Sequence, residues 1–340
     1  IMFCLVWIRR TVKLVLTNRL RTYEDVNFIN KFYFQPLLIA TSLKGNAAVV
    51  EDLVKSGAEV NCADENGWTP LHSASSNGHE KIVEFLVKRG AKINCADKNG
   101  WTPLYVASVN GHEETIKCLV KYGADINRAD KHGWTPLYMT SSKGQEKIVE
   151  CLVKCGAEIE PANTFDWTPL YIASVNGHEK TVQCLVENGA EVNRADYNGR
   201  TPLYAASSDG HENIVECLLK YGAEINRADN NGWTPLIVAS SHGYQKTVEC
   251  LVKHEAEINR ATYSGYTALG RATLSGHQNI EKYLAEFGAI RNRTSNSDAT
   301  LPWFKRFDVI RRLRSILHYP FYMFSCISSA LHKAVVKKKI

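Results

Sequence analysis

No apolar run in the 340-residue sequence reaches the ~18–20 residues that a membrane-spanning helix needs. The N-terminal stretch IMFCLVWI is short, and its arginines follow it, which is the wrong order of charge for a secretory signal. The expected location is therefore cytoplasmic, with the nucleus as a second possibility. The opening at Ile1 is what we expect of a fragment of a longer protein.

The motifs of common catalytic sites are also missing. There is no Gly-rich phosphate loop, no nucleophile elbow and no paired acid motif. The ten cysteines form no Cys-x-x-Cys or Cys/His cluster at metal-ligand spacing, and five of them recur at a fixed step: Cys118, Cys151, Cys184, Cys217 and Cys250. A disulfide needs Cα atoms closer than about 7 Å, whereas stacked helices lie roughly 8–10 Å apart. We expect free, buried cysteines, no enzymatic activity, no cofactor and no metal.

The net charge of +6 is unevenly distributed. Residues 37–290 carry 24 Lys/Arg against 31 Asp/Glu, and the excess of basic residues lies in 1–36 and 291–340. The central part is therefore acidic overall, which argues against nucleic-acid binding there. Any basic partner surface belongs to the two ends.

Large side chains return every 33 residues at the position before a threonine. They are Trp68, Trp101, Trp134, Trp167, Arg200, Trp233 and Tyr266, here called the Trp column. A fixed period of this length predicts a repeat architecture rather than two ordinary domains.

The repeat Ala91–Gly123 shows what one period encodes. Its Asn-Gly pair favours a tight hairpin turn. Thr102 is expected to be the N-cap of a short helix with Pro103 in its first turn, and a second helix is expected from about His112. Two short helices and a turn bury an apolar face only by stacking on their neighbours, which predicts a solenoid.

The motifs TPLH (Thr69–His72), GH (Gly78–His79) and VKRGAKIN (Val87–Asn94) resemble the ankyrin repeat. The resemblance covers residues 37–290 and implies an all-α ankyrin-repeat solenoid of about eight helix pairs linked by β-hairpin turns. The first pair is expected at 37–57, and seven more begin at Pro70, Pro103, Pro136, Pro169, Pro202, Pro235 and Ala268. Residues 1–36 and 291–340 are expected to be non-repeat basic segments.

Two places depart from the repeat. The fifth hairpin, EPANTFD (Glu160–Asp166), lacks the Asn and Gly of its neighbours. Glu255 stands where other repeats have the glycine that closes the second helix, so this helix end is expected to be strained or differently closed.

The Trp column has two interpretations. A residue before an N-cap commonly packs on the fourth helical residue. The apolar partners would be Val106 for Trp101, Met139 for Trp134, Ile172 for Trp167 and Val238 for Trp233. Trp68 is the exception, because its fourth helical residue is Ser73. The resemblance also implies that this position lies on the concave, ligand-contacting side. Half-covered tryptophans there would form an aromatic stripe that binds a protein or peptide partner. We expect the protein itself to be a monomer.

Two polar columns are expected to be structural. The first is His79, His112, His178, His211 and His277, with Gln145 and Tyr244 as substitutes, and the second is Asn61, Asn94, Asn127, Asn193, Asn226 and Asn259. Replacement of histidine by glutamine indicates hydrogen bonding rather than catalysis. The asparagines are expected to bond hairpin backbone groups.

The segment Leu301–Leu317 has the pattern of a basic amphipathic helix. Its apolar side is Phe307, Ile310, Leu313 and Leu317, and its cations are Lys305, Arg306, Arg311, Arg312 and Arg314. Such a helix binds anionic membranes or a partner groove, and weak membrane contact through residues 301–331 would make the protein peripheral. The same side could instead cover the last repeat. A third possibility is that the chain is the interaction region of a larger enzyme or channel.

Overall fold

The computed structural model describes residues 35–291. Within this range the chain forms sixteen helices and no strand. The first helices of the eight pairs are α3 (Gln35–Leu43), α5 (Pro70–Ser76), α7 (Pro103–Val109), α9 (Pro136–Ser142), α11 (Pro169–Asn176), α13 (Pro202–Asp209), α15 (Pro235–His242) and α17 (Ala268–Ser275). The second helices are α4 (Ala47–Lys55), α6 (Glu80–Lys88), α8 (Glu113–Lys121), α10 (Glu146–Lys154), α12 (Glu179–Glu187), α14 (Glu212–Lys220), α16 (Gln245–Lys253) and α18 (Gln278–Glu286).

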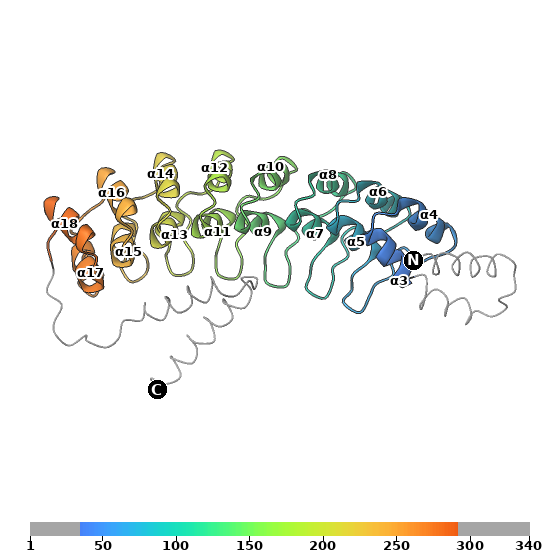
Figure 1. The fold of residues 1–340 in the computed structure, drawn as a ribbon, viewed down its shortest axis with the longest axis horizontal. Coiled ribbons are helices and arrows are strands. Elements are labelled where there is room, and N and C mark those ends of the chain that lie inside the picture. Colours follow the sequence, from blue (N-terminus) through green and yellow to red (C-terminus); the bar gives the residue numbers. More distant parts are fainter. Residues whose placement is uncertain (1–34, 292–340) are drawn as a thin grey trace, which may run out of the picture. The chain divides into compact units, whose positions relative to one another are not determined.

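The pairs stack side by side, and the helices form two rows (Figure 1). Even-numbered helices make one row and odd-numbered helices the other, with the hairpin loops projecting beyond the odd-numbered row. The predicted solenoid of eight pairs is confirmed, with the first pair starting at Gln35, two residues earlier than expected.

The start of each first helix follows the predicted chemistry. The Thr102 hydroxyl accepts the backbone N–H of Tyr105 at 3.1 Å, and Pro103 occupies the first turn, where its missing N–H costs nothing. The loop before it is a hairpin-like turn: Asp97 N donates to Trp101 O at 2.9 Å, and Gly100 N donates to Asp97 O at 3.0 Å.

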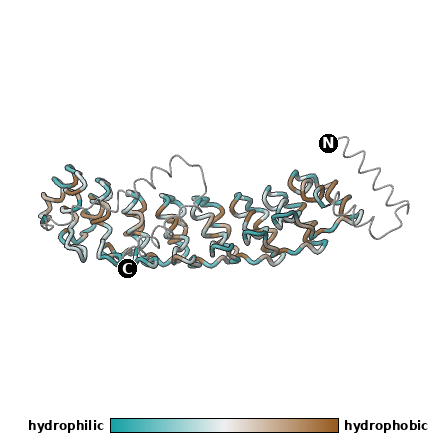
Figure 2. Tube along the Cα trace, turned by 90° about the horizontal axis from the view of Figure 1, so that it is seen from below, coloured by the Kyte–Doolittle hydropathy of each residue, from teal (hydrophilic) through white to brown (hydrophobic). Residues whose placement is uncertain are grey.

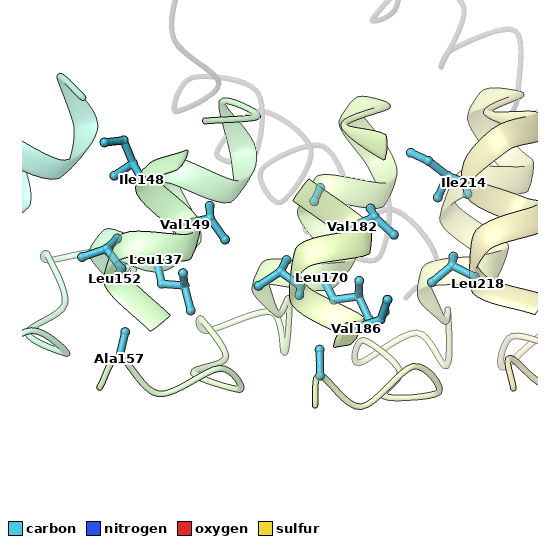
Figure 3. Packing of buried hydrophobic residues seen from close by; sticks show 14 of the residues in the cluster. Leu137, Ile148, Val149, Leu152, Ala157, Leu170, Val182, Val186, Ile214 and Leu218 are labelled. Carbon is cyan, nitrogen blue, oxygen red and sulfur yellow. The ribbon is translucent and has the colours of Figure 1, made fainter. Parts of the chain in front are cut away.

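The hydrophobic core lies between consecutive pairs. Leu137, Val149 and Leu152 on one pair and Leu170 and Val182 on the next belong to this core (Figure 3), and all five are buried. Apolar segments return in every helix pair along the array (Figure 2). Each helix is too short to be stable alone, so this shared core holds the array together.

Hydrogen bonds between neighbouring repeats confirm the role of the histidine column. His112 Nε2 bonds Ser76 O at 2.9 Å in the preceding repeat, and Gln145 Nε2 donates to Val109 O at 3.2 Å. Each side chain thus contacts a carbonyl at the end of the preceding first helix.

The asparagine column is also structural, as predicted. Asn61 Nδ2 donates to Gly90 O at 3.0 Å, and its Oδ1 accepts the N–H of Lys92 at 2.7 Å. The asparagine therefore bonds backbone groups at the start of the next repeat's loop, because stacking brings that loop alongside.

Asp166 and Glu255 are the only non-glycine residues with positive φ among residues 35–291, at +58° and +64°. The other repeats have glycine at nearly all of the equivalent positions, because glycine adopts positive φ without steric cost. The predicted strain at Glu255 is therefore confirmed.

Two side chains of the fifth hairpin make hydrogen bonds that replace part of what its missing asparagine and glycine would allow. Asn163 Oδ1 accepts the Trp167 N–H at 3.1 Å, and Glu160 Oε1 accepts the Glu191 N–H at 2.9 Å. Neighbouring hairpins are linked by bonds such as Lys98 N to Asn66 O at 2.8 Å. Within the described range, no such bond joins the fourth hairpin to the fifth, and the one from the sixth to the fifth is long, at 3.5 Å.

The predicted amphipathic helix at Leu301–Leu317 and the N-terminal segment 1–34 lie outside the described residues. Among residues 35–291, no helix has both the length and the apolar character to cross a membrane.

Candidate protein-binding surface

Each member of the Trp column sits at the base of a hairpin, directly before the first helix of its pair. The backbone position of Trp101 is held by Asp97, whose Oδ1 accepts the N–H groups of Asn99 and Trp101, both at 2.8 Å. Asp130, Asp196 and Asp229 do the same in their hairpins. The sequence Asp-x-x-Gly-Trp therefore fixes where each ring begins.

Three of the rings stack on the third residue of the helix that follows. Trp101 stacks on Tyr105 with ring centroids 5.7 Å apart. The pairs Trp134–Tyr138 and Trp167–Tyr171 repeat this arrangement, at 6.0 Å and 5.5 Å. The third helical residue offers a flat aromatic face to each ring. Packing of the rings on the fourth helical residue stays a prediction.

The Trp column is less exposed than half-covered rings would be. Trp134 and Trp233 are buried, with 5% and 9% of their surface exposed. Trp68, Trp101 and Trp167 are of intermediate exposure. Among the five tryptophans of the column, Trp68, Trp101 and Trp167 therefore offer the more accessible ring surface to a partner.

Two further members of the column differ in chemistry. The Arg200 guanidinium lies over the Tyr204 ring, 5.6 Å from its centroid. At the end of the array, Tyr266 is half-buried and packs against Arg271, which also lies over the Trp233 ring at 4.9 Å. Cation–π contacts of this kind are favourable where water is partly excluded.

The side chain below each ring ties neighbouring repeats together. His72 Nε2 bonds Trp101 O at 2.9 Å, and Tyr171 OH donates to Asp196 Oδ2 at 3.3 Å. Burial lowers the pKa of His72 below its usual value and raises the pKa of Tyr171 well above its usual value. Both side chains are therefore neutral structural links near pH 7.

Sequence reasoning missed the exposed aromatics at the hairpin tips. Tyr197 is 58% exposed and Tyr263 is 83% exposed. The centroid of the Phe165 ring lies 6.1 Å from that of Tyr197 and 5.9 Å from that of Trp167. A signal was present in the sequence. Most hairpins carry a polar or charged residue at the repeat position of Tyr197 and Tyr263, and also at the repeat position of Phe165.

Burial keeps most of the described thiols protonated and poorly nucleophilic. All eight cysteines in residues 35–291 are free. Burial raises the pKa of Cys62 to about 12 and, with help from neighbouring Cys155, that of Cys151 to about 12, so both thiols stay protonated. In the same range, no group of three or more His, Cys, Asp or Glu side chains is placed to hold a metal ion.

Stacked pairs of short helices, joined by projecting hairpins with a ring or cation at each base, define a class of repeat solenoid whose rigid face suits macromolecular recognition. The family described as ankyrin repeats (3 copies) matches residues 8–97, 89–163, 155–229 and 227–295, and the chain belongs to this family. Ankyrin repeats are generally protein–protein interaction modules and are typically non-catalytic. Among curated proteins, no match to the chain is found.

Proposed function

We propose that the array is a non-catalytic scaffold that binds a partner protein or peptide along the hairpin side, through the Trp column. The observation that carries this proposal is the placement of one aromatic ring or cation per repeat at the same fixed point. Trp68, Trp101 and Trp167 each keep part of their surface exposed while the rest is held by the helix below.

Rigid, partly covered aromatics are the side chains from which binding hot spots are built. Their conformations are already restricted by stacking, so little entropy is lost when a partner covers them. The free cysteines support a reducing compartment, which favours a cytoplasmic or nuclear location over a secreted one.

The test is an affinity pull-down with the whole chain, followed by affinity measurement for the tightest partner. The double variant Trp101→Arg/Trp167→Arg reproduces the residue that repeat six carries naturally at this point, so the array is expected to fold. We expect binding of the partner to weaken by more than about 2 kcal/mol, as for hot-spot residues.

Tyr263→Lys is the matched control. It removes an exposed ring from a hairpin tip, where Lys98 and Lys131 are natural equivalents. We expect this variant to retain affinity. If the double variant has a native circular dichroism spectrum and binds as tightly as the parent chain, the Trp column has only a structural role.

A further inference from the structure

Departures from the repeat gather at one place on the hairpin side, between repeats five and six. Repeat five has Phe165 and Asp166 where most repeats have Asn-Gly, and repeat six has Tyr197 at the hairpin tip and Arg200 in the Trp column. These substitutions are separated in sequence, yet stacking places the two hairpins side by side.

The aromatic members form a continuous chain of rings. The ring centroids of Tyr197 and Phe165 lie 6.1 Å apart, and those of Phe165 and Trp167 lie 5.9 Å apart. Trp167 stacks on Tyr171 with a centroid distance of 5.5 Å. The chain runs from an exposed tip to a buried floor, because Tyr197 is 58% exposed and Tyr171 only 4%.

Arg200 is linked to this chain from the other hairpin. Tyr171 OH donates to Asp196 Oδ2 at 3.3 Å, and Asp196 Oδ1 accepts the backbone N–H of Arg200 at 2.9 Å. The ring chain is therefore linked through Tyr171 and Asp196 to the backbone of Arg200, whose guanidinium lies over the Tyr204 ring of the same repeat.

Within residues 35–291, the Arg200 guanidinium makes no hydrogen bond and no ion pair. Its Nε is buried without an acceptor. The carboxylates of Asp196 and Asp229 attract the guanidinium but form no ion pair with it, and both already accept backbone N–H groups of their own hairpins. A partly buried guanidinium with free donors is matched best by an oxyanion that binds through two parallel hydrogen bonds.

The same place carries structural costs that the other hairpins avoid. Asp166 holds φ at +58°, in the left-handed region that favours glycine. Asn163 Nδ2 is buried with no hydrogen-bond partner. The equivalent positions of the other described hairpins carry neither a strained non-glycine residue nor an unsatisfied side chain, and such costs at one point often mark a functional site.

We propose that the ring chain Tyr197–Phe165–Trp167 together with Arg200 is a specificity pocket for a peptide segment that carries a carboxylate side chain next to an apolar or aromatic residue. The carboxylate binds the Arg200 guanidinium, and the neighbouring side chain packs on Phe165 and Trp167. This pocket rests on the proposed protein-binding function and deepens it, since it assigns the chemistry of the bound segment.

Charge favours a carboxylate over a phosphate. One guanidinium supplies a single positive charge, and the carboxylates of Asp196 and Asp229 place negative charge near it. A phosphoryl group carries about −1.5 to −2 at pH 7 and would meet stronger repulsion there than a carboxylate of charge −1.

The test starts with a displayed library of random linear peptides selected on the whole chain. We expect selected peptides to share an Asp or Glu beside an apolar or aromatic residue. A synthetic copy of a selected peptide should bind Arg200→Trp about 10- to 100-fold more weakly than the parent chain, as expected for loss of a hydrogen-bonded ion pair. Arg200→Trp restores the residue of the Trp column and so preserves the fold. Phe165→Asn, which restores the tip residue of other hairpins, should also weaken binding.

Three comparisons decide the result. Changing the peptide carboxylate to its amide should weaken binding to the parent chain and have little effect on Arg200→Trp, because the two changes remove the same contact. Tyr263→Lys should bind as the parent does. A phosphoserine in place of the acidic residue should bind more weakly than the carboxylate, and tighter binding would overturn the assignment.

Failure of the pocket differs from failure of the proposed function. Selected peptides that bind Arg200→Trp and Phe165→Asn normally but lose affinity for Trp101→Arg/Trp167→Arg would overturn the pocket and retain the Trp column as the binding surface. A selection that enriches no acidic peptides would also overturn the pocket.

Discussion

Glu255→Gly should stabilise the array, because residue 255 occupies a left-handed conformation that the other repeats assign to glycine. The equivalent residues are Gly57, Gly90, Gly123, Gly156, Gly189, Gly222 and Gly288, with φ between +78° and +95°. Glu255 has φ +64° and closes its helix in the same way, since Ala256 N donates to Leu251 O at 3.1 Å. The substitution therefore changes the residue without requiring a different backbone.

The size of the effect follows from two opposing contributions. A Cβ placed at any of the seven glycines meets nothing within 4 Å, so the cost at Glu255 comes from the backbone and not from crowding. Relief of a left-handed non-glycine residue is worth about 1–2 kcal/mol. The greater freedom of glycine in the unfolded chain offsets about 0.5–1 kcal/mol. The Glu255 side chain makes no hydrogen bond or ion pair within the described range, so about 0.5–1 kcal/mol should remain as net stabilisation.

Thermal and urea unfolding monitored by circular dichroism would measure this change. We expect the midpoint temperature to rise by about 1–4 °C. Gly222→Glu is the reverse substitution at an equivalent helix end and should lower stability by a similar amount. If Glu255→Gly is neutral or destabilising while Gly222→Glu is tolerated, the left-handed backbone at this column carries no cost and the reasoning is wrong.

Three further outcomes are expected. Backbone amides at residues 158–168 should exchange hydrogen faster than those of the other internal hairpins, because the bonds linking this hairpin to its neighbours are missing or long; equal protection in all hairpins would contradict this. Burial lowers the pKa of His72, so the unfolded chain binds a proton first, and stability should fall as pH drops from about 6.5 towards the lowered pKa. His72→Tyr, the residue of four other repeats, should remove that part of the pH dependence in unfolding titrations. A peptide of residues 291–340 should co-sediment with anionic vesicles at low salt and be released at high salt if the segment is membrane-binding, and no binding at low salt would exclude this.

The regular part of the fold was predictable from the sequence because its causes are local and repeated. Thr102 and Pro103 specify a helix start within a few residues, and the Asp-x-x-Gly turn specifies the loop before it. The 33-residue step then predicts stacking, since no single pair can bury its own apolar face. The strain at Glu255 was predictable in the same way, from one residue that breaks a glycine column.

The candidate site was less predictable because it depends on contacts between hairpins. The position of the Trp column was clear from the sequence, but its exposure was not: Trp134 and Trp233 are buried while Trp101 keeps a partly exposed ring. The same residue type in the same column ends in different surroundings, because exposure depends on which side chains the neighbouring repeats place around it.

The sequence by itself therefore determined the repeat, its helix boundaries and the kind of residue at each hairpin base. Only the tertiary structure decided that Phe165 and Tyr197, 32 residues apart, join in one chain of rings. It also decided that the Arg200 guanidinium lies over the Tyr204 ring without a hydrogen-bonding partner in the described residues. The physical reason is that turn and cap chemistry acts over four or five residues, whereas the chemistry of a binding surface depends on the stacking that brings consecutive repeats into contact.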